Sequence, residues 1–213
     1  MIYQMPRIFP DAVAENLVIM TNGVGAKNGL SAFISKIVLD LNLMEAGTQC
    51  FPLYLYDEPD SETADQAVLF ATSTVTKGER KRRDAITDEG LAHFLAAYPG
   101  ETIGKEDVFY YVYGLLHSPE YRERYADNLS KELPRIPCVK IAADFWAFSK
   151  TGRALAELHL NYETVAPYPV KIDSGGKMLT DADYRVEKMK YGKQDKDKDL
   201  TTLHYNDKIT LTG

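Results

Sequence analysis

The sequence predicts an α+β fold, with a mostly antiparallel sheet and a central helical segment of about four helices. Segments typical of strands occupy both ends of the chain, and segments typical of helices occupy the middle. Near the end, Asn206-Asp207 separates two short strand patterns in the way a tight hairpin turn does, which makes that pair antiparallel. A length of 213 residues allows one domain, or one domain with a small appendage, and we expect a single domain over 1–213, with residues 57–83 as an exposed charged connection within it.

Strand patterns dominate the first third of the chain. Residues 17–20 form a short apolar run that is closed by the glycine-rich loop 21–29, which indicates a buried strand. Residues 33–41 fit both a helical period and strand alternation, and we interpret them as a strand. Residues 49–56 form a clearer, aromatic-rich strand. One more short strand is expected over 68–74, inside the charged connection.

Helical patterns fill the middle of the chain. The first helix spans 87–97, because it opens on a threonine that can act as an N-cap, followed by two acidic residues. The second spans 105–117. A third starts at once, since Ser118 is a natural N-cap and Pro119 is favoured at the first helical position. The fourth spans 145–163, where apolar residues recur at helical spacing and predict a core helix.

Strand patterns return in the last quarter. Strands are expected over 168–172, 184–191, 201–205 and 208–211. Between the second and third of them, residues 193–199 alternate lysine and aspartate, which indicates a solvated loop.

The charges of the chain are segregated. There are 25 Lys and Arg against 31 Asp and Glu, for a net charge of −6, which excludes a histone-like polycation. However, residues 57–65 hold five acids and no base, whereas residues 77–83 hold five bases and one acid. A basic segment of this density can contact several phosphates, so the acidic total does not exclude DNA binding. The segregation predicts weak DNA binding by this chain alone, with a salt dependence that falls when residues 80–83 are neutralised.

Eleven residues are candidates for DNA contact. They lie in the basic segment, in the 21–29 loop, where an asparagine can read adenine edges, and in a weaker basic cluster near the end of the chain. They are Lys77, Arg80, Lys81, Arg82, Arg83, Asn22, Lys27, Asn28, Arg185, Lys188 and Lys190.

Signals for other chemistry are weak. Asp60, Glu79 and Lys81 have the residue types of a PD-(D/E)xK nuclease, in which carboxylates hold Mg²⁺, but so short a pattern arises readily by chance. Gly23-Val24-Gly25 follows a strand without the rest of a dinucleotide motif, which favours a plain loop over a cofactor site. There is no CxxC, no signal-peptide pattern and no membrane-spanning apolar run, so we expect a cytoplasmic protein with no metal or other cofactor of its own.

The block from Phe109 to Pro137, which begins FYYVYGLLHSPEYRERY, strongly resembles a segment of type ISP restriction-modification enzymes and related helicase-methylases. The resemblance extends over nearly the whole chain, through Gln49–Tyr54, Phe145–Phe148 with Gly152-Arg153, and Leu158–Glu163. It implies the C-terminal target-recognition region, which recognises double-stranded DNA for catalytic domains that these residues do not contain. Family members are expected to continue beyond residue 213, which predicts a fragment.

Three functions follow from these observations. The first is a non-catalytic, sequence-specific DNA recognition module of a bacterial enzyme. In this reading, the resemblance implies that methyltransferase and helicase domains of the parent are partners and that S-adenosylmethionine, ATP and Mg²⁺ serve the parent. The second is a small Mg²⁺-dependent nuclease, and the third is a scaffold that docks the methyltransferase. The aromatic residues of the 109–137 block fit a helical face and are expected to be structural.

Overall fold

The structure is a computed structural model that describes residues 5–57, 80–194 and 197–213. The chain folds as two compact units, unit 1 from Met1 to Glu163 and unit 2 from Thr164 to Gly213. Every residue from 162 to 173 is exposed, so the segment in which the units meet along the chain contributes little to either core. All strand pairs in the described part of the chain are antiparallel, which confirms the α+β class.

Unit 1 contains a three-stranded sheet in the order β2-β1-β3. The strands are β1 (Val18–Asn22), β2 (Ala32–Ser35) and β3 (Thr48–Pro52). The central strand is buried on both faces, because Ile19 contacts one hydrophobic cluster while Val18 and Met20 contact another. A strand covered on both sides appears in the sequence as a continuous apolar run, which is why its position was predicted correctly.

The strand expected over 33–41 is corrected to β2, which ends at Ser35. The Ser35 hydroxyl accepts a hydrogen bond from the Ile37 N–H and lies at the same distance, 3.1 Å, from the Ile37 carbonyl. Such a local bond between a serine side chain and the backbone competes with the ladder of a sheet and turns the chain. The apolar residues beyond Ser35 therefore lie in a loop.

A two-stranded ribbon lies next along the chain, formed by β4 (Tyr54–Tyr56) and β5 (Arg82–Asp84). The single strand expected over 49–56 is divided at the buried Leu53, whose N–H donates to the Leu17 carbonyl at 2.7 Å. The end of the basic segment was expected in a loop and is corrected to a strand, β5, which pairs with β4. The sequence did not predict this strand, because pairing with a distant segment leaves no local signal. The strand expected over 68–74 lies outside the described residues.

The four predicted helices are confirmed, as α3 (Asp88–Ala97), α4 (Lys105–Leu116), α5 (Pro119–Arg124) and α7 (Ala142–Leu160). Their caps form as expected. The Thr87 hydroxyl accepts from the Gly90 N–H at 3.1 Å, and the Ser118 hydroxyl accepts from the Tyr121 N–H at 3.3 Å. Two further helices, α1 (Met5–Ile8) and α6 (Ala126–Leu129), are too short to show a period in the sequence.

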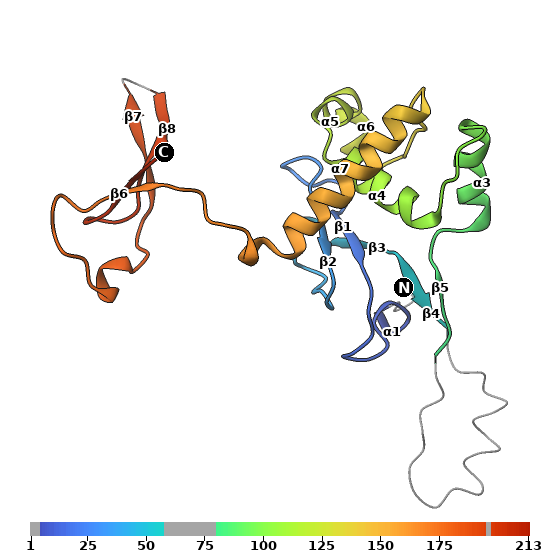
Figure 1. Ribbon diagram of the computed structural model, residues 1–213, viewed down its shortest axis with the longest axis horizontal. Helices are drawn as coiled ribbons and strands as arrows, with labels where there is room; N and C mark the ends of the chain where they lie inside the picture. The colour runs from blue at the N-terminus through green and yellow to red at the C-terminus, as the bar shows by residue number, and fades with distance from the viewer. Residues whose placement is uncertain (1–4, 58–79, 195–196) are drawn as a thin grey trace, which may run out of the picture. The chain divides into compact units, whose positions relative to one another are not determined.

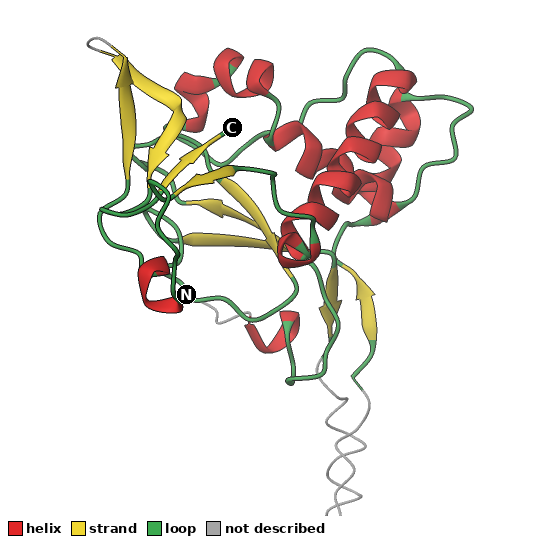
Figure 2. Cartoon of the chain, turned by 60° about the vertical axis from the view of Figure 1, so that its left-hand side comes forward, coloured by secondary structure: helices red, strands yellow, loops and turns green. Residues whose placement is uncertain are grey.

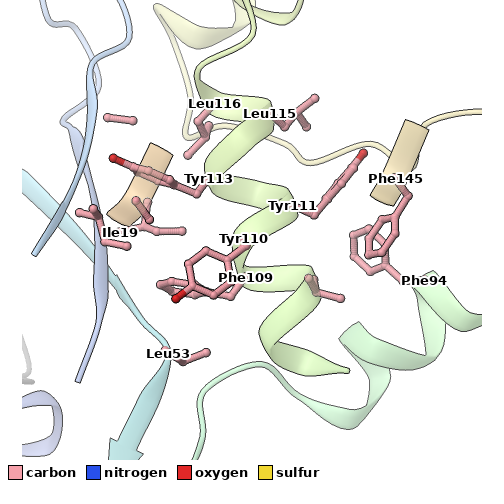
Figure 3. Packing of buried hydrophobic residues seen from close by; sticks show 14 of the residues in the cluster. Ile19, Leu53, Phe94, Phe109, Tyr110, Tyr111, Tyr113, Leu115, Leu116 and Phe145 are labelled. Carbon is pink, nitrogen blue, oxygen red and sulfur yellow. The ribbon is translucent and has the colours of Figure 1, made fainter. Parts of the chain in front are cut away.

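The core of unit 1 is built around α4 (Figure 3). Tyr111, Tyr113 and Phe145 are completely buried, and the rings of Tyr111 and Phe145 stack with centroids 4.8 Å apart. The two tyrosine hydroxyls bind the Pro137 carbonyl at 2.6 Å and His159 Nδ1 at 2.5 Å. The aromatic block is therefore structural, as predicted, because its rings fill the core and its hydroxyls have partners.

Helix α7 lies along α4 (Figure 1), and two glycines bring the helices close together. A Cβ on Gly152 would lie 2.0 Å from the Tyr110 carbonyl oxygen, and one on Gly114 would lie 2.4 Å from that of Phe148. Both contacts are to backbone atoms, which cannot move as a flexible side chain can. The helix pair therefore requires the absence of a side chain at both positions.

Unit 2 is a four-stranded sheet in the order β6-β9-β8-β7, drawn in yellow in Figure 2 together with the other strands. The strands are β6 (Lys171–Asp173), β7 (Lys190–Gln194), β8 (Asp197–His204) and β9 (Thr210–Thr212). The β8–β9 hairpin is confirmed, although its turn is longer than a two-residue one. The Asn206 side chain closes it by accepting from the N–H groups of Lys208 and Ile209, both at 2.9 Å.

Two other predictions for unit 2 are corrected. The strand expected over 184–191 begins only at Lys190, because the Asn206 amide donates to the carbonyls of Asp183 and Arg185 at 2.8 and 3.1 Å. These carbonyls are thus bound by a side chain instead of a neighbouring strand. Apart from residues 195 and 196, which are not described, the stretch 193–199 belongs to β7 and β8 instead of a solvated loop. Residues 193, 194, 197 and 198 are exposed, so the composition of this stretch resembles that of a loop.

One apolar row crosses the whole sheet of unit 2. The strand register aligns Ile172, Leu211, Leu203 and Tyr191, one residue from each strand. Directly paired residues lie on the same face of a sheet, so these four side chains share one face. The outer two are about half exposed, Ile172 at 53% and Tyr191 at 49%.

Candidate nucleic-acid interface

The basic segment 77–83 holds the densest group of predicted DNA contacts. The structure describes its last four residues, and Lys77 lies outside the described residues. Arg82 pairs with Tyr56 and Arg83 with Leu55 across the β4–β5 ribbon. Because successive side chains of a strand point to opposite faces, the two arginines lie on opposite faces of the ribbon.

Arg83 is bound to a carboxylate. Its Nε lies 2.9 Å from Asp57 Oδ1, and both side chains are 40–45% exposed. An exposed pair of this kind contributes only about 0.2–1 kcal/mol to stability. It nevertheless places a negative charge against the guanidinium, which leaves Arg83 less available to a ligand than an unpaired arginine.

Arg82 is stacked on an aromatic ring instead. Its Cζ lies 4.2 Å from the centroid of the Tyr54 ring, and no carboxylate of the described residues forms an ion pair with it. Arginine stacks in this way because its cation is attracted to the ring face, while the donors at the edge of the guanidinium plane stay open. Arg82 therefore presents a charge that is held in place and exposed.

The Tyr54 platform is held by the buried Asn16. The Asn16 amide donates to the carbonyls of Tyr54 and Ile8, both at 2.9 Å, and accepts from the Tyr54 N–H at 3.1 Å. Two residues after Tyr54 on the same strand, the Tyr56 hydroxyl donates to the Glu15 carbonyl at 2.7 Å. The strand that carries the stacking ring is thus attached to the segment before β1.

The two other described cations of the segment, Arg80 and Lys81, differ in whether their side chains have a partner. Arg80 is half-buried, and its Nη1 donates to the Pro6 carbonyl at 3.3 Å, which ties the start of the described segment to α1. Lys81 uses its backbone carbonyl to accept from the Asp57 N–H at 3.0 Å. Its ammonium is exposed and has no partner in the described part of the chain.

The asparagines of the 21–29 loop hold the loop together. Asn22 is 7% exposed, and its side chain donates to the Gly29 carbonyl at 2.6 Å and accepts from the Ser31 N–H at 2.9 Å. The Asn28 amide donates to Glu45 at 3.0 Å, and the Lys27 N–H donates to the same carboxylate at 2.9 Å. This backbone bond from Lys27 is the main reason that the pKa of Glu45 lies below its usual value. The Lys27 ammonium alone stays open in this loop.

The glycine motif of this loop has a packing role. A Cβ on Gly23 would lie 1.9 Å from the Ala46 carbonyl oxygen, so the chain approaches its own backbone too closely for a side chain. This close approach gives Gly23 a role in the packing of the loop.

The basic residues near the end of the chain belong to unit 2. Arg185 and Lys188 lie between the 3-10 turn Asp181–Tyr184 and β7, and Lys190 is the first residue of β7, opposite His204. All three are exposed, and none forms an ion pair within the described residues. Unit 2 therefore presents a separate group of open cations.

Sequence reasoning missed Lys36 and a pocket beside it. The pocket has a volume of about 530 Å³ and lies at the base of the ribbon in unit 1. It is lined by residues 12–17, Lys36, Leu53, Tyr54, Arg82 and Glu106. Lys36 follows β2 as an isolated exposed lysine, which is a pattern too common on protein surfaces to signal a site.

The remaining predicted chemistry finds no support in the described residues. Asp60 and Glu79 of the nuclease pattern lie outside them. Within them, no group of three or more His, Cys, Asp or Glu side chains is placed to hold a metal ion. None of the described helices is both long and apolar enough to cross a membrane.

Comparisons with known proteins relate the whole chain to one family. The model of the type ISP C-terminal specificity domain matches residues 1–213. No curated protein matches the chain.

Three of the solved structures that are similar to the chain contain DNA or a DNA substrate mimic. The ATP-dependent type ISP restriction-modification enzyme LlaBIII bound to DNA is 32% identical, with a TM-score of 0.73 over 99% of this chain and 12% of that one. The DrdV–DNA complex is 34% identical, with a TM-score of 0.74 over 99% of this chain and 19% of that one. A nuclease-deletion mutant of the type ISP enzyme LlaGI with a DNA substrate mimic is 30% identical, with a TM-score of 0.65, over 98% and 15%. The chain thus spans less than a fifth of each of these enzymes.

Proposed function

Because the chain belongs to the family of type ISP C-terminal specificity domains, we propose that it is the DNA target-recognition module of a larger restriction-modification enzyme. One observation carries this proposal. Nearly the whole chain, 98–99% of it, matches three enzymes solved with DNA at 30–34% identity. The match includes both units, so the proposed module comprises the helical unit 1 and the sheet of unit 2.

The proposed partners follow from how little of those enzymes the chain covers. With 12–19% of their length, it corresponds to the specificity part of such an enzyme. We propose that the methyltransferase and helicase domains of the parent supply the catalysis. S-adenosylmethionine, ATP and Mg²⁺ would act there, and this chain would bind no cofactor. The setting would be the cytoplasm of a bacterium, where restriction enzymes meet DNA.

The proposed contacts are those of the predicted cations that the fold leaves open. In unit 1 these are Lys27, Lys81 and Arg82, and in unit 2 they are Arg185, Lys188 and Lys190. Phosphate contacts of this kind hold a protein in register on the duplex, and sequence is then read at the base edges. Lys77 stays a proposed contact from its place in the basic segment.

A DNA-binding titration tests the proposal. The purified chain is mixed with labelled duplexes in a series of salt concentrations, and bound duplexes are then selected from a random library. The expected result is salt-dependent binding and enrichment of one sequence motif. Binding without enrichment would contradict a recognition role, and no salt-dependent binding would favour a scaffold that docks the methyltransferase.

The nuclease alternative has its own assay. The chain is incubated with plasmid and Mg²⁺, and cleavage that is lost in Glu79→Ala would support catalysis by Asp60, Glu79 and Lys81. The recognition proposal predicts intact plasmid with both proteins. Cleavage by the wild-type chain that depends on Glu79 would overturn the non-catalytic reading.

A further inference from the structure

We infer that Arg82 and Lys36 form a subsite that binds a phosphate of the DNA backbone, at the pocket at the base of the ribbon that Tyr54 also lines. This inference rests on the proposed function. The two cations come from places far apart in the chain. Lys36 follows β2, and Arg82 lies on β5, yet both line the same pocket. No family match assigns a role to either residue.

The stacking of Arg82 favours a phosphate ligand. Tyr54 covers one face of the guanidinium at 4.2 Å, so the cation is held in one orientation before any ligand arrives. The N–H donors of a stacked guanidinium lie in its plane and match the geometry of phosphate oxygens. With its position already fixed, Arg82 loses less conformational entropy on binding than a freely rotating side chain does.

Lys36 adds a second positive charge. Its ammonium is exposed and has no ion pair in the described part of the chain. Convergence of an arginine fork and a lysine point charge on one opening is suited to an anion that carries several acceptor oxygens.

The acidic residues of the pocket offset at most one of these two charges. Glu106 is bound by Arg153, with 2.7 Å between Oε1 and Nη1, and the Arg153 guanidinium lies 4.1 Å from the centroid of the Tyr110 ring. This pair is close to neutral as a unit. Glu15 is then the one lining carboxylate that lacks an ion pair among the described residues.

The pocket offers charge more than a stacking surface for a base. Arg82 already occupies one face of the Tyr54 ring, so that face is unavailable to a nucleobase. Loss of a phosphate contact and loss of a base contact also have different effects on DNA binding. The former weakens binding to all sequences equally, whereas the latter relaxes specificity at one position.

The test compares two adjacent arginines. Duplex affinity of the full chain is measured against salt for the wild type, Arg82→Ala, Lys36→Ala and the control Arg83→Ala. Arg83 is the matched control because it has the same charge, lies next to Arg82 on the same strand, and is bound by Asp57 on the opposite face.

We expect Arg82→Ala and Lys36→Ala each to reduce the slope of log K against log salt by about 0.9, the value for one lost phosphate contact. The same slope corresponds to about eightfold weaker binding at about 0.1 M salt, for every duplex sequence. Arg83→Ala should keep the wild-type slope. Arg82→Lys should keep most of the slope, because the charge remains when the planar stack is lost.

Several outcomes would overturn the inference. If Arg82→Ala and Arg83→Ala show the same salt slope, the phosphate subsite is contradicted. The proposed function still holds in that case, provided that the wild-type chain binds DNA in a salt-dependent way. A loss confined to one duplex sequence would replace the phosphate with a base edge. No salt-dependent binding by the wild type would overturn the proposed function and the subsite together. Arg82→Gln is a second neutral variant, and thermal melting of each variant shows that the fold is kept.

Discussion

The side-chain amide of Asn16 binds both backbone groups of Tyr54, donating to its carbonyl at 2.9 Å and accepting from its N–H at 3.1 Å. A neighbouring strand would satisfy the same two groups through its backbone. Here one buried side chain does so, from a position 38 residues earlier in the chain. The ring on which Arg82 stacks thus depends on a residue that carries no charge.

Replacement of Asn16 by alanine is expected to destabilise unit 1 by about 2–4 kcal/mol, because it leaves a buried backbone group of Ile8 and partly buried ones of Tyr54 without a partner. Urea unfolding measures the change. Asn28→Ala is the control, since its amide makes one exposed bond to Glu45 and its loss should cost less than about 1 kcal/mol. Equal costs for the two variants would contradict the prediction.

Gly152→Ala is expected to destabilise the chain by about 3 kcal/mol or to prevent folding, because the new Cβ overlaps the Tyr110 backbone. Gly90→Ala is the control. At Gly90, in α3, the nearest atom to an added Cβ is the Thr87 hydroxyl at 3.4 Å. That change should be neutral or stabilising by up to about 1 kcal/mol. Thermal melting compares them, and a tolerated Gly152→Ala would mean that the helices are farther apart than described.

Acidification is expected to destabilise unit 1 through His117. Its Nδ1 lies 2.9 Å from the Tyr113 carbonyl and its Nε2 lies 3.2 Å from the Ala32 carbonyl. Burial lowers the pKa of His117 below its ordinary value of 6.5, with smaller effects of the same sign from Arg122 and His159, although these two carbonyls oppose the shift.

The sign of the pH effect follows from this lowered pKa. Just below pH 6.5 the unfolded chain binds the proton and the folded chain does not, so the free energy of unfolding falls as the pH falls. The slope from one such group is at most about 1.4 kcal/mol per pH unit. Urea unfolding between about pH 7.5 and about pH 5.5 measures it. His117→Gln should flatten the profile, and an unchanged slope would show that another group is responsible.

Asn206→Ala is expected to loosen unit 2 alone. It removes two bonds that close the β8–β9 turn and two that hold the carbonyls of Asp183 and Arg185. Hydrogen exchange should rise about tenfold or more within 164–213, which corresponds to about 1.4 kcal/mol of local stability. Exchange in unit 1 should not change. Asp207→Ala in the same turn is the control, and equal acceleration of both units would contradict their separate folding.

Local signals predicted much of the helical unit. The hydroxyls of Thr87 and Ser118 bind the first turns of their helices, so each start is encoded within a few residues. The continuous apolar run of β1 likewise marks a strand that is buried on both sides. Resemblance over nearly the whole chain indicates the family from the amino-acid sequence alone.

The state of each candidate contact could not be predicted, because it depends on distant partners. The sequence identified the basic segment, but nothing local separates Arg82, which stacks on Tyr54, from Arg83, which binds Asp57. Asn22 lies in a loop that was predicted to contact adenine edges, but its amide is bound to backbone groups of that loop. Lys36 had no signal at all, since only the folded chain brings it to the pocket of Arg82.

The outer strands of the unit 2 sheet discourage the pairing of one molecule with another. A sheet edge has unpaired backbone groups, and an open apolar row such as that ending at Ile172 and Tyr191 adds to the hazard of aggregation. β6 is only three residues long, and β7 carries Lys190 and Lys193 and has a register shift after Tyr191. Short length, lysines and irregular register all disfavour edge-to-edge addition of strands. The charges that made this segment resemble a loop thus help to keep copies of the chain apart.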